Sequence, residues 1–135
     1  MTIEKLQTGD LPAYKTLMDE CFGSSSVDGY KESGSYDIVV AKEDGKLLGS
    51  VTLYKIELFT FSFQPCIELF NVAVTKEARG KGVGTALMEY SKNYAAENGY
   101  KSLMLTCLDE ATPAHRLYEA VGFKKAPSRK YALYL

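Results

Sequence analysis

The organisation of the chain is decided by one stretch of sequence, Leu69-Phe70-Asn71-Val72-Ala73-Val74, which leads five residues later into Arg79-Gly80-Lys81-Gly82-Val83-Gly84-Thr85. The first part is almost continuously apolar, which is typical of a strand covered on both faces of a sheet. The second part leads into residues with apolar side chains at helical spacing, so it marks the start of a helix. Three glycines at this junction are unfavourable for a helix, at about 1 kcal/mol each, and need a separate explanation.

The glycine-rich turn has the composition of an anion-binding loop. Without Cβ atoms its backbone can approach a bulky anion, and the free N–H groups of the helix start point at that anion with the positive end of the helix dipole behind them. Arg79 and Lys81 add positive charge, and Thr85 adds a hydroxyl group. A Walker P-loop is excluded because Gly82 follows Lys81 where Ser or Thr is required, and a dinucleotide fingerprint is excluded because Thr85 replaces its third glycine. We expect a pyrophosphate cradle, with tight strand–helix packing as the alternative explanation.

Apolar periodicity predicts the other elements. The first helix follows Asp10, which we expect to cap it, the second ends at Gly99, and the third begins at Thr112 and ends at Gly122. Strands are expected over residues 2–6, 36–41, 46 to the boundary at Pro65, 66–74, 101–107 and 130–135. Residues 23–35 are expected to form a loop, with a short helix near Val27. Because strand 101–107 follows a strand and a helix, it forms a parallel crossover. The prediction is an α/β fold with a mixed, mostly antiparallel sheet of six to seven strands and helices on both faces.

Composition narrows the possible functions. The 135 residues are expected to form one domain over 1–135, and 16 basic against 17 acidic residues leave a net charge of −1, which disfavours nucleic acid and membrane surfaces as partners. No apolar run is long enough to span a membrane, and the N-terminus lacks a signal peptide pattern. The single His115 and three scattered cysteines disfavour a metal site and disulfides. We expect a cytoplasmic protein without a metal.

Two motifs identify a family resemblance. Arg79, Gly82 and Gly84 match the pattern R/Q-x-x-G-x-G/A, and Ala114-His115-Arg116-Leu117-Tyr118-Glu119-Ala120-Val121-Gly122-Phe123 matches A-x-x-x-Y-x-x-x-G-F/Y. With both, the chain resembles the GNAT superfamily of N-acetyltransferases over essentially its whole length, most strongly from Glu68 to Phe123. The resemblance implies the GNAT fold, in which the two parallel strands splay apart.

The resemblance also implies acetyl-CoA as co-substrate. Its diphosphate would lie on the cradle formed by Arg79, Gly80, Lys81, Gly82, Val83, Gly84 and Thr85. The backbone of Val72, Ala73 and Val74, at a bulge in the strand, would bind the pantetheine amides as an added strand does. One of these N–H groups would polarise the thioester carbonyl. Many relatives carry an Asn where this chain has Ala111, so another residue such as Thr106 or Thr112 is expected to compensate.

Two residues are implied as catalytic. An alkyl amine is only about one part in 10³ neutral at pH 7, so a base is useful, and Glu68 occupies the position of a family carboxylate that deprotonates the acceptor. A solvated or lysine-paired glutamate is the alternative. Tyr118 matches the family tyrosine that protonates the departing thiolate, and its alternative role is packing on the inner face of its helix. Some relatives instead place this glutamate on the following strand, where this chain has Thr106, so the resemblance favours Glu68.

The most favoured function is transfer of the acetyl group to a primary amine of a small molecule, directly in a ternary complex. Acetylation of a protein N-terminus, as in ribosomal-protein acetylating relatives, and a non-catalytic acyl-CoA sensor remain alternatives. The acceptor is expected to contact residues 23–35 and 54–63. Phe59, Phe61 and Phe63 would form either a dimer patch or part of the core, so the predicted state is a monomer or a homodimer.

Overall fold

The computed structural model describes residues 1–23, 27–58 and 64–135. Within them the chain forms one sheet in the order β1-β2-β3-β4-β5. All neighbours are antiparallel except β4 and β5, which are parallel. The strands are β1 Thr2–Lys5, β2 Tyr36–Glu43, β3 Lys46–Ile56, β4 Cys66–Val74 and β5 Ser102–Leu105. The predicted fold class is confirmed, with five strands in the described residues rather than six to seven.

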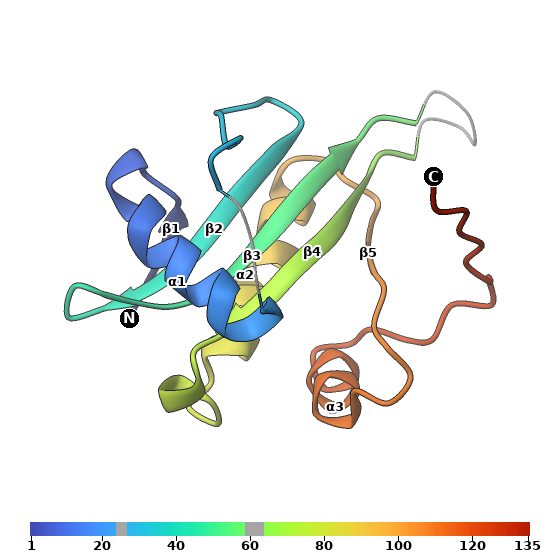
Figure 1. The fold of residues 1–135 in the computed structure, drawn as a ribbon. Coiled ribbons are helices and arrows are strands. Elements are labelled where there is room, and N and C mark those ends of the chain that lie inside the picture. The colour runs from blue at the N-terminus through green and yellow to red at the C-terminus, as the bar shows by residue number, and fades with distance from the viewer. Residues whose placement is uncertain (24–26, 59–63) are drawn as a thin grey trace.

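The helices lie on both faces of this sheet, as predicted. Figure 1 shows α1 in front of the sheet and α2 behind it, with α3 beside β5. Their bounds are α1 Leu11–Phe22, α2 Val83–Glu97 and α3 Thr112–Ala120, and short 3₁₀ turns span Thr8–Asp10 and Lys76–Ala78. No helix in the described part of the chain has the length and apolar character that crossing a membrane requires.

Each face of the sheet has its own apolar cluster. The larger lies under α2 and includes Val51, Leu53, Ile67, Leu87 and Met88. The smaller lies under α1, where buried Tyr14, Leu17 and Met18 pack with Ala73. These three α1 residues follow the predicted i, i+3, i+4 spacing. Since Ala73 is near the end of β4, α1 covers only one end of its face of the sheet.

The predicted strand over residues 130–135 is wrong. The segment after α3 forms no strand, and Figure 1 shows it running away from the sheet. Tyr131 and Leu133 keep 88% and 85% of their surface exposed. A segment with an alternating pattern forms a strand only where a neighbouring strand supplies backbone hydrogen bonds. No described strand pairs with this segment.

Several local details also differ from the prediction. The Asp10 carboxylate does not cap α1 but accepts the Gln7 N–H at 2.9 Å and pairs with Lys42 at 2.6 Å. Residues 27–30 form a turn, with Tyr30 N–H donating to the Val27 carbonyl, rather than a short helix. Thr112 is the first residue of α3 rather than its cap. Side-chain oxygens are good caps only when the backbone ahead of the helix turns them toward free N–H groups.

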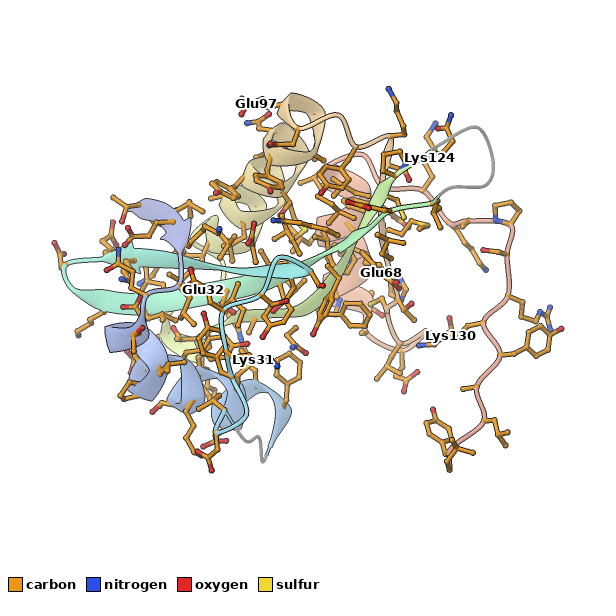
Figure 2. All side chains as sticks on the ribbon, turned by 90° about the horizontal axis from the view of Figure 1, so that it is seen from above. Lys31, Glu32, Glu68, Glu97, Lys124 and Lys130 are labelled. Atoms are coloured by element: carbon orange, nitrogen blue, oxygen red, sulfur yellow. The ribbon has the colours of Figure 1, made fainter. Side chains whose placement is uncertain are left out.

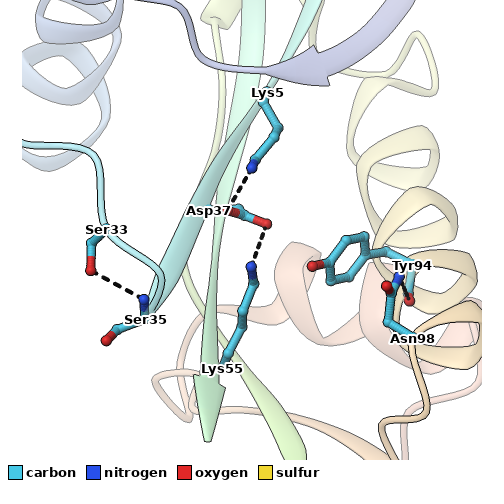
Figure 3. A network of polar contacts seen from close by, with 7 residues as sticks. All are labelled: Lys5, Ser33, Ser35, Asp37, Lys55, Tyr94 and Asn98. Atoms are coloured by element: carbon cyan, nitrogen blue, oxygen red, sulfur yellow. Dashed lines mark hydrogen bonds and ion pairs between the residues drawn. The ribbon is translucent and has the colours of Figure 1, made fainter.

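A buried carboxylate ties β2 to its neighbours near the other end of the sheet (Figure 3). The Asp37 side chain, 6% exposed, pairs with Lys5 of β1 at 3.1 Å and Lys55 of β3 at 3.0 Å. The Lys55 ammonium also lies 5.6 Å from the centre of the Tyr94 ring on α2. Burial alone would raise the pKa of Asp37, but hydrogen bonds and charge from the two lysines outweigh it and hold the pKa below its usual value.

The lowered pKa of Asp37 makes its contribution to stability pH-dependent. A carboxyl whose pKa is lower in the folded state stabilises the fold above its unfolded value of about 3.9, and this contribution is lost as pH falls through the folded pKa. We expect Asp37→Asn to reduce the free energy of unfolding at pH 7 by about 1–3 kcal/mol. In urea unfolding the difference from the parent should shrink below about pH 4. Asp44→Asn, at an exposed hairpin turn, serves as control, and a pH-independent difference for Asp37→Asn would contradict the assignment.

Candidate functional site

The C-terminal end of β4 has an irregular backbone and lacks a paired strand on its β5 side. Ser50 of β3 faces Ala73 and Thr52 faces Phe70, so Asn71 and the residue after it stand opposite a single residue of β3. This is a β-bulge, and Asn71 adopts a left-handed conformation with φ of 53°. Pairing of β4 with β5 ends at Leu69, so in the described residues no strand pairs with the β5-facing edge of β4 from Phe70 onward. The bulge and the splay implied by the family resemblance are therefore present.

The glycine turn lies next to this opening, between β4 and α2. Gly80 and Gly82 have φ of 77° and 82°, a conformation that glycine adopts without steric cost, and Gly82 is the N-cap of α2. A Cβ atom added to either would meet nothing within 4 Å. Among the described residues no side chain caps α2. The first N–H groups of α2 therefore have no intrahelical partner and no capping group, and open space lies in front of the turn.

The third glycine has a different role. A Cβ on Gly84 would stand 3.0 Å from Leu117 of α3, so this glycine allows α2 and α3 to pack closely. Lys92 of α2 supports the same contact, because its ammonium donates to the Val121 carbonyl at 2.9 Å. Gly84 therefore serves packing between two helices, whereas the alternative stated from the sequence was packing of a strand on a helix. Gly80 and Gly82 shape the turn, and Gly84 positions α3.

Gly49, which the sequence analysis did not single out, also lies at the junction of β4 and α2. A Cβ on Gly49 of β3 would lie 2.7 Å from the Ala73 carbonyl oxygen and 2.9 Å from a Val83 methyl group. Both contacts are closer than a real Cβ tolerates, and the first is to backbone. Gly49 therefore lets the start of α2 approach the end of β4. Its sequence signal was a glycine inside an alternating strand, which often marks a close backbone approach.

The other residues predicted to form the cradle lie in the same turn or at its two ends. Val83 is buried in the larger core, whereas Lys81 and Thr85 are exposed. The Arg79 Nε–H donates to the Val74 carbonyl at 3.2 Å, which places the guanidinium against the end of β4. Val72 and Val74 are half-buried and pack on the larger core, so their backbone groups are what they present to the opening.

Glu68 lies on the α1 face of the sheet, in the part that α1 leaves uncovered (Figure 2). Its strand neighbours Ile67 and Leu69 are buried in the core under α2, and successive side chains of a strand point to opposite faces. Within the described residues no lysine or arginine lies within 4.0 Å of the Glu68 carboxylate. The lysine-paired alternative therefore has no partner in this part of the chain.

Tyr118 lies on the α2 side of the sheet, near Cys107, which follows β5. It projects from α3, packs against the core under α2 and meets the Phe123 ring edge-to-face at 6.1 Å between centroids. Burial, and to a smaller extent the neighbouring Cys107 just beyond β5, raises the pKa of the Tyr118 phenol. The phenol is therefore protonated at neutral pH.

Glu68 and Tyr118 thus belong to opposite faces of the sheet, Glu68 to the α1 face and Tyr118 to the cluster under α2. Ala111 is the residue before α3, and Thr106, just beyond β5, is exposed. The predicted patch of Phe59, Phe61 and Phe63, and residues 24–26 of the predicted acceptor loop, lie outside the described residues. No group of three His, Cys, Asp or Glu side chains suited to a metal ion occurs in the described residues.

Comparison with known proteins bears directly on this geometry. The sequence model of the acetyltransferase (GNAT) family matches residues 4–123. The chain belongs to this family. The resemblance read from the two motifs is therefore confirmed, and the parallel β4 and β5 with the glycine turn between β4 and α2 are the GNAT arrangement.

Named relatives agree with membership of the GNAT family. The chain is 34% identical over 87 residues to an uncharacterized N-acetyltransferase of Schizosaccharomyces pombe, covering 64% of this chain and 50% of that protein. It is 33% identical over 88 residues to the uncharacterized N-acetyltransferase YhfO of Bacillus subtilis, covering 65% and 58%. The chain thus spans between half and three fifths of the length of these two relatives.

A solved structure shares the whole fold. A putative acetyltransferase from Agrobacterium tumefaciens str. C58 superposes with a TM-score of 0.88 at 22% identity, covering 99% of this chain and all of that one. At this identity the likeness concerns the fold and not the substrate. The match of residues 4–123 to the GNAT family model is what makes this chain a member of a family of acyltransferases.

Proposed function

We propose that this protein transfers the acetyl group of acetyl-CoA to a primary amine of a small molecule, directly within a ternary complex. The observation that carries the proposal is the combination of an uncapped helix start with an unpaired strand edge. The backbone around Gly82 offers N–H groups to a diphosphate, with space in front of it. The edge of β4 that no described strand pairs offers backbone groups around Val72 to the amides of a pantetheine arm.

The co-substrate supplies an acetyl group that is activated as a thioester. Side chains of the protein accept and donate the protons that the reaction transfers. Glu68 accepts a proton from the acceptor ammonium, directly or through water, and leaves a neutral amine. The new C–N bond forms at the carbonyl carbon as the C–S bond breaks. A backbone N–H of Val72 or Ala73 stabilises the charge on the carbonyl oxygen. Tyr118 donates its proton to the departing thiolate, and the second proton lost by the attacking nitrogen restores the phenol through solvent.

Two measurements test this function. Titration calorimetry with acetyl-CoA should show binding to a single site well below 1 mM. Thiol release in the presence of acetyl-CoA and a panel of small amines should then exceed the rate without amine. Turnover of peptide N-termini alone would replace the small-molecule acceptor with a protein acceptor. Binding without any turnover would indicate the sensor function, and the absence of binding at about 1 mM would remove the proposal.

A further inference from the structure

Side chains from four strands form a row on the α1 face of the sheet, beside the opening between β4 and β5. Strand register places Tyr36 opposite Tyr54, Tyr54 opposite Glu68 and Glu68 opposite Met104. All four point to the same face, because paired residues share a face of a sheet. Phe70, two residues after Glu68, lies on that face as well. We call these five residues the cross-strand row.

The aromatic rings of the row support one another but remain accessible. The centroids of Tyr36 and Tyr54 are 5.2 Å apart, and Tyr54 meets Phe70 edge-to-face at the same distance. The Tyr36 hydroxyl donates to the Lys31 carbonyl at 2.8 Å, which fixes that ring. Even so, Tyr54, Phe70 and Met104 keep 39%, 43% and 46% of their surface exposed. The row is therefore an ordered apolar surface of the kind that takes a flat apolar group.

The charge on the row is a single carboxylate. Glu68 has no ion-pair partner within the described residues, and it is next to Tyr54 across the strand pair. Lys31 and Glu32 lie on the segment before β2, away from Glu68 (Figure 2). A polycation would need several carboxylates, and a polyhydroxylated amine would need many hydrogen-bonding groups where this row offers rings. One ammonium attached to an apolar group matches both the charge and the surface.

We infer that the acceptor is an amine carrying an aromatic or similarly flat apolar group, with that group on Tyr54 and Phe70 and its ammonium at Glu68. This inference rests on the proposed function and specifies its substrate class. Tyr54 and Phe70 then determine acceptor specificity without taking part in the chemistry. Glu68 selects the ammonium before it accepts its proton.

Steady-state acetylation of matched amines tests the inference. With acetyl-CoA, we expect kcat/KM for 2-phenylethylamine to exceed that for ethanolamine, glucosamine and spermidine by about 10-fold or more, as burial of a ring in an apolar site implies. Phe70→Ala and Tyr54→Leu should each raise KM for 2-phenylethylamine several-fold and leave KM for ethanolamine and the affinity for acetyl-CoA nearly unchanged. Tyr131→Ala, which removes a still more exposed ring from the C-terminal segment, is the control.

The possible outcomes distinguish failure of the proposed acceptor class from failure of the proposed acetyltransferase function. Equal or better acetylation of glucosamine or spermidine would overturn the acceptor class while leaving the acetyltransferase function in place. Equal loss for aromatic and non-aromatic amines in Phe70→Ala would overturn the role of the row. Acetyl-CoA binding without turnover of any of the four amines would also overturn the inference. Absence of acetyl-CoA binding would overturn the proposed acetyltransferase function, and this inference with it.

Discussion

Gly82→Leu is expected to weaken acetyl-CoA binding by about 100-fold or more in a protein that remains folded. A side chain at this position would project into the open space in front of the turn, where the diphosphate is proposed to lie. Loss of two hydrogen bonds to a charged group, at about 1.5–3 kcal/mol each, corresponds to at least this change in affinity. Titration calorimetry measures the affinity, and thermal unfolding shows whether the fold is retained.

The control for Gly82→Leu is a glycine with the same backbone strain elsewhere. Gly45, in the turn between β2 and β3, has φ of 75° and equally open surroundings. Leucine in the left-handed region costs about 1–2 kcal/mol at either position, so the two variants should lose similar stability. Only Gly82→Leu should lose binding. Parental affinity for acetyl-CoA in a folded Gly82→Leu protein would show that the turn is not the cradle.

Tyr118→Phe is expected to lower kcat by about 100-fold, the range in which a positioned general acid contributes. The ring and its contact with Phe123 are kept, so the affinity for acetyl-CoA should remain within about twofold. Burial raises the pKa of this phenol, so at neutral pH the parent carries the proton that the variant lacks. Thiol release at saturating substrates measures kcat, and calorimetry measures the affinity.

The role of Tyr118 as an acid has a second signature. Acetyl thioesters with more acidic thiols need less protonation as they leave, so their turnover should fall less in Tyr118→Phe than turnover of acetyl-CoA does. Tyr90→Phe, which removes a hydroxyl from a half-buried tyrosine of α2, should leave kcat unchanged. Unchanged kcat in Tyr118→Phe would leave packing as the role of Tyr118.

Much of the fold was predictable because its signals are local. The β2–β3 hairpin turns at Asp44 and Gly45, which adopt the positive φ values that their residue types tolerate. Gly99 and Gly122 likewise end α2 and α3 in positive φ. These positions depend on one or two neighbouring residues, so the sequence alone indicates them.

The errors occur where a segment needs a distant partner. The alternation over residues 130–135 is that of a strand, but no described strand pairs with it. Asp10 is a residue type that often caps helices, but its carboxylate forms an ion pair with Lys42, which is distant in the sequence. A local sequence pattern does not indicate whether a residue will interact with its sequence neighbours or with a residue that folding brings close to it.

The sequence by itself determined the family, the order of elements and the position of the glycine turn, since these follow from motifs and periodicities within short windows. Only the tertiary structure decided that Gly84 and Gly49 serve packing, that Glu68 and Tyr118 belong to opposite faces of the sheet, and that the cross-strand row forms. The reason is physical: each of these depends on strand register and on how closely a helix approaches the sheet, and both are set by packing between segments far apart along the chain.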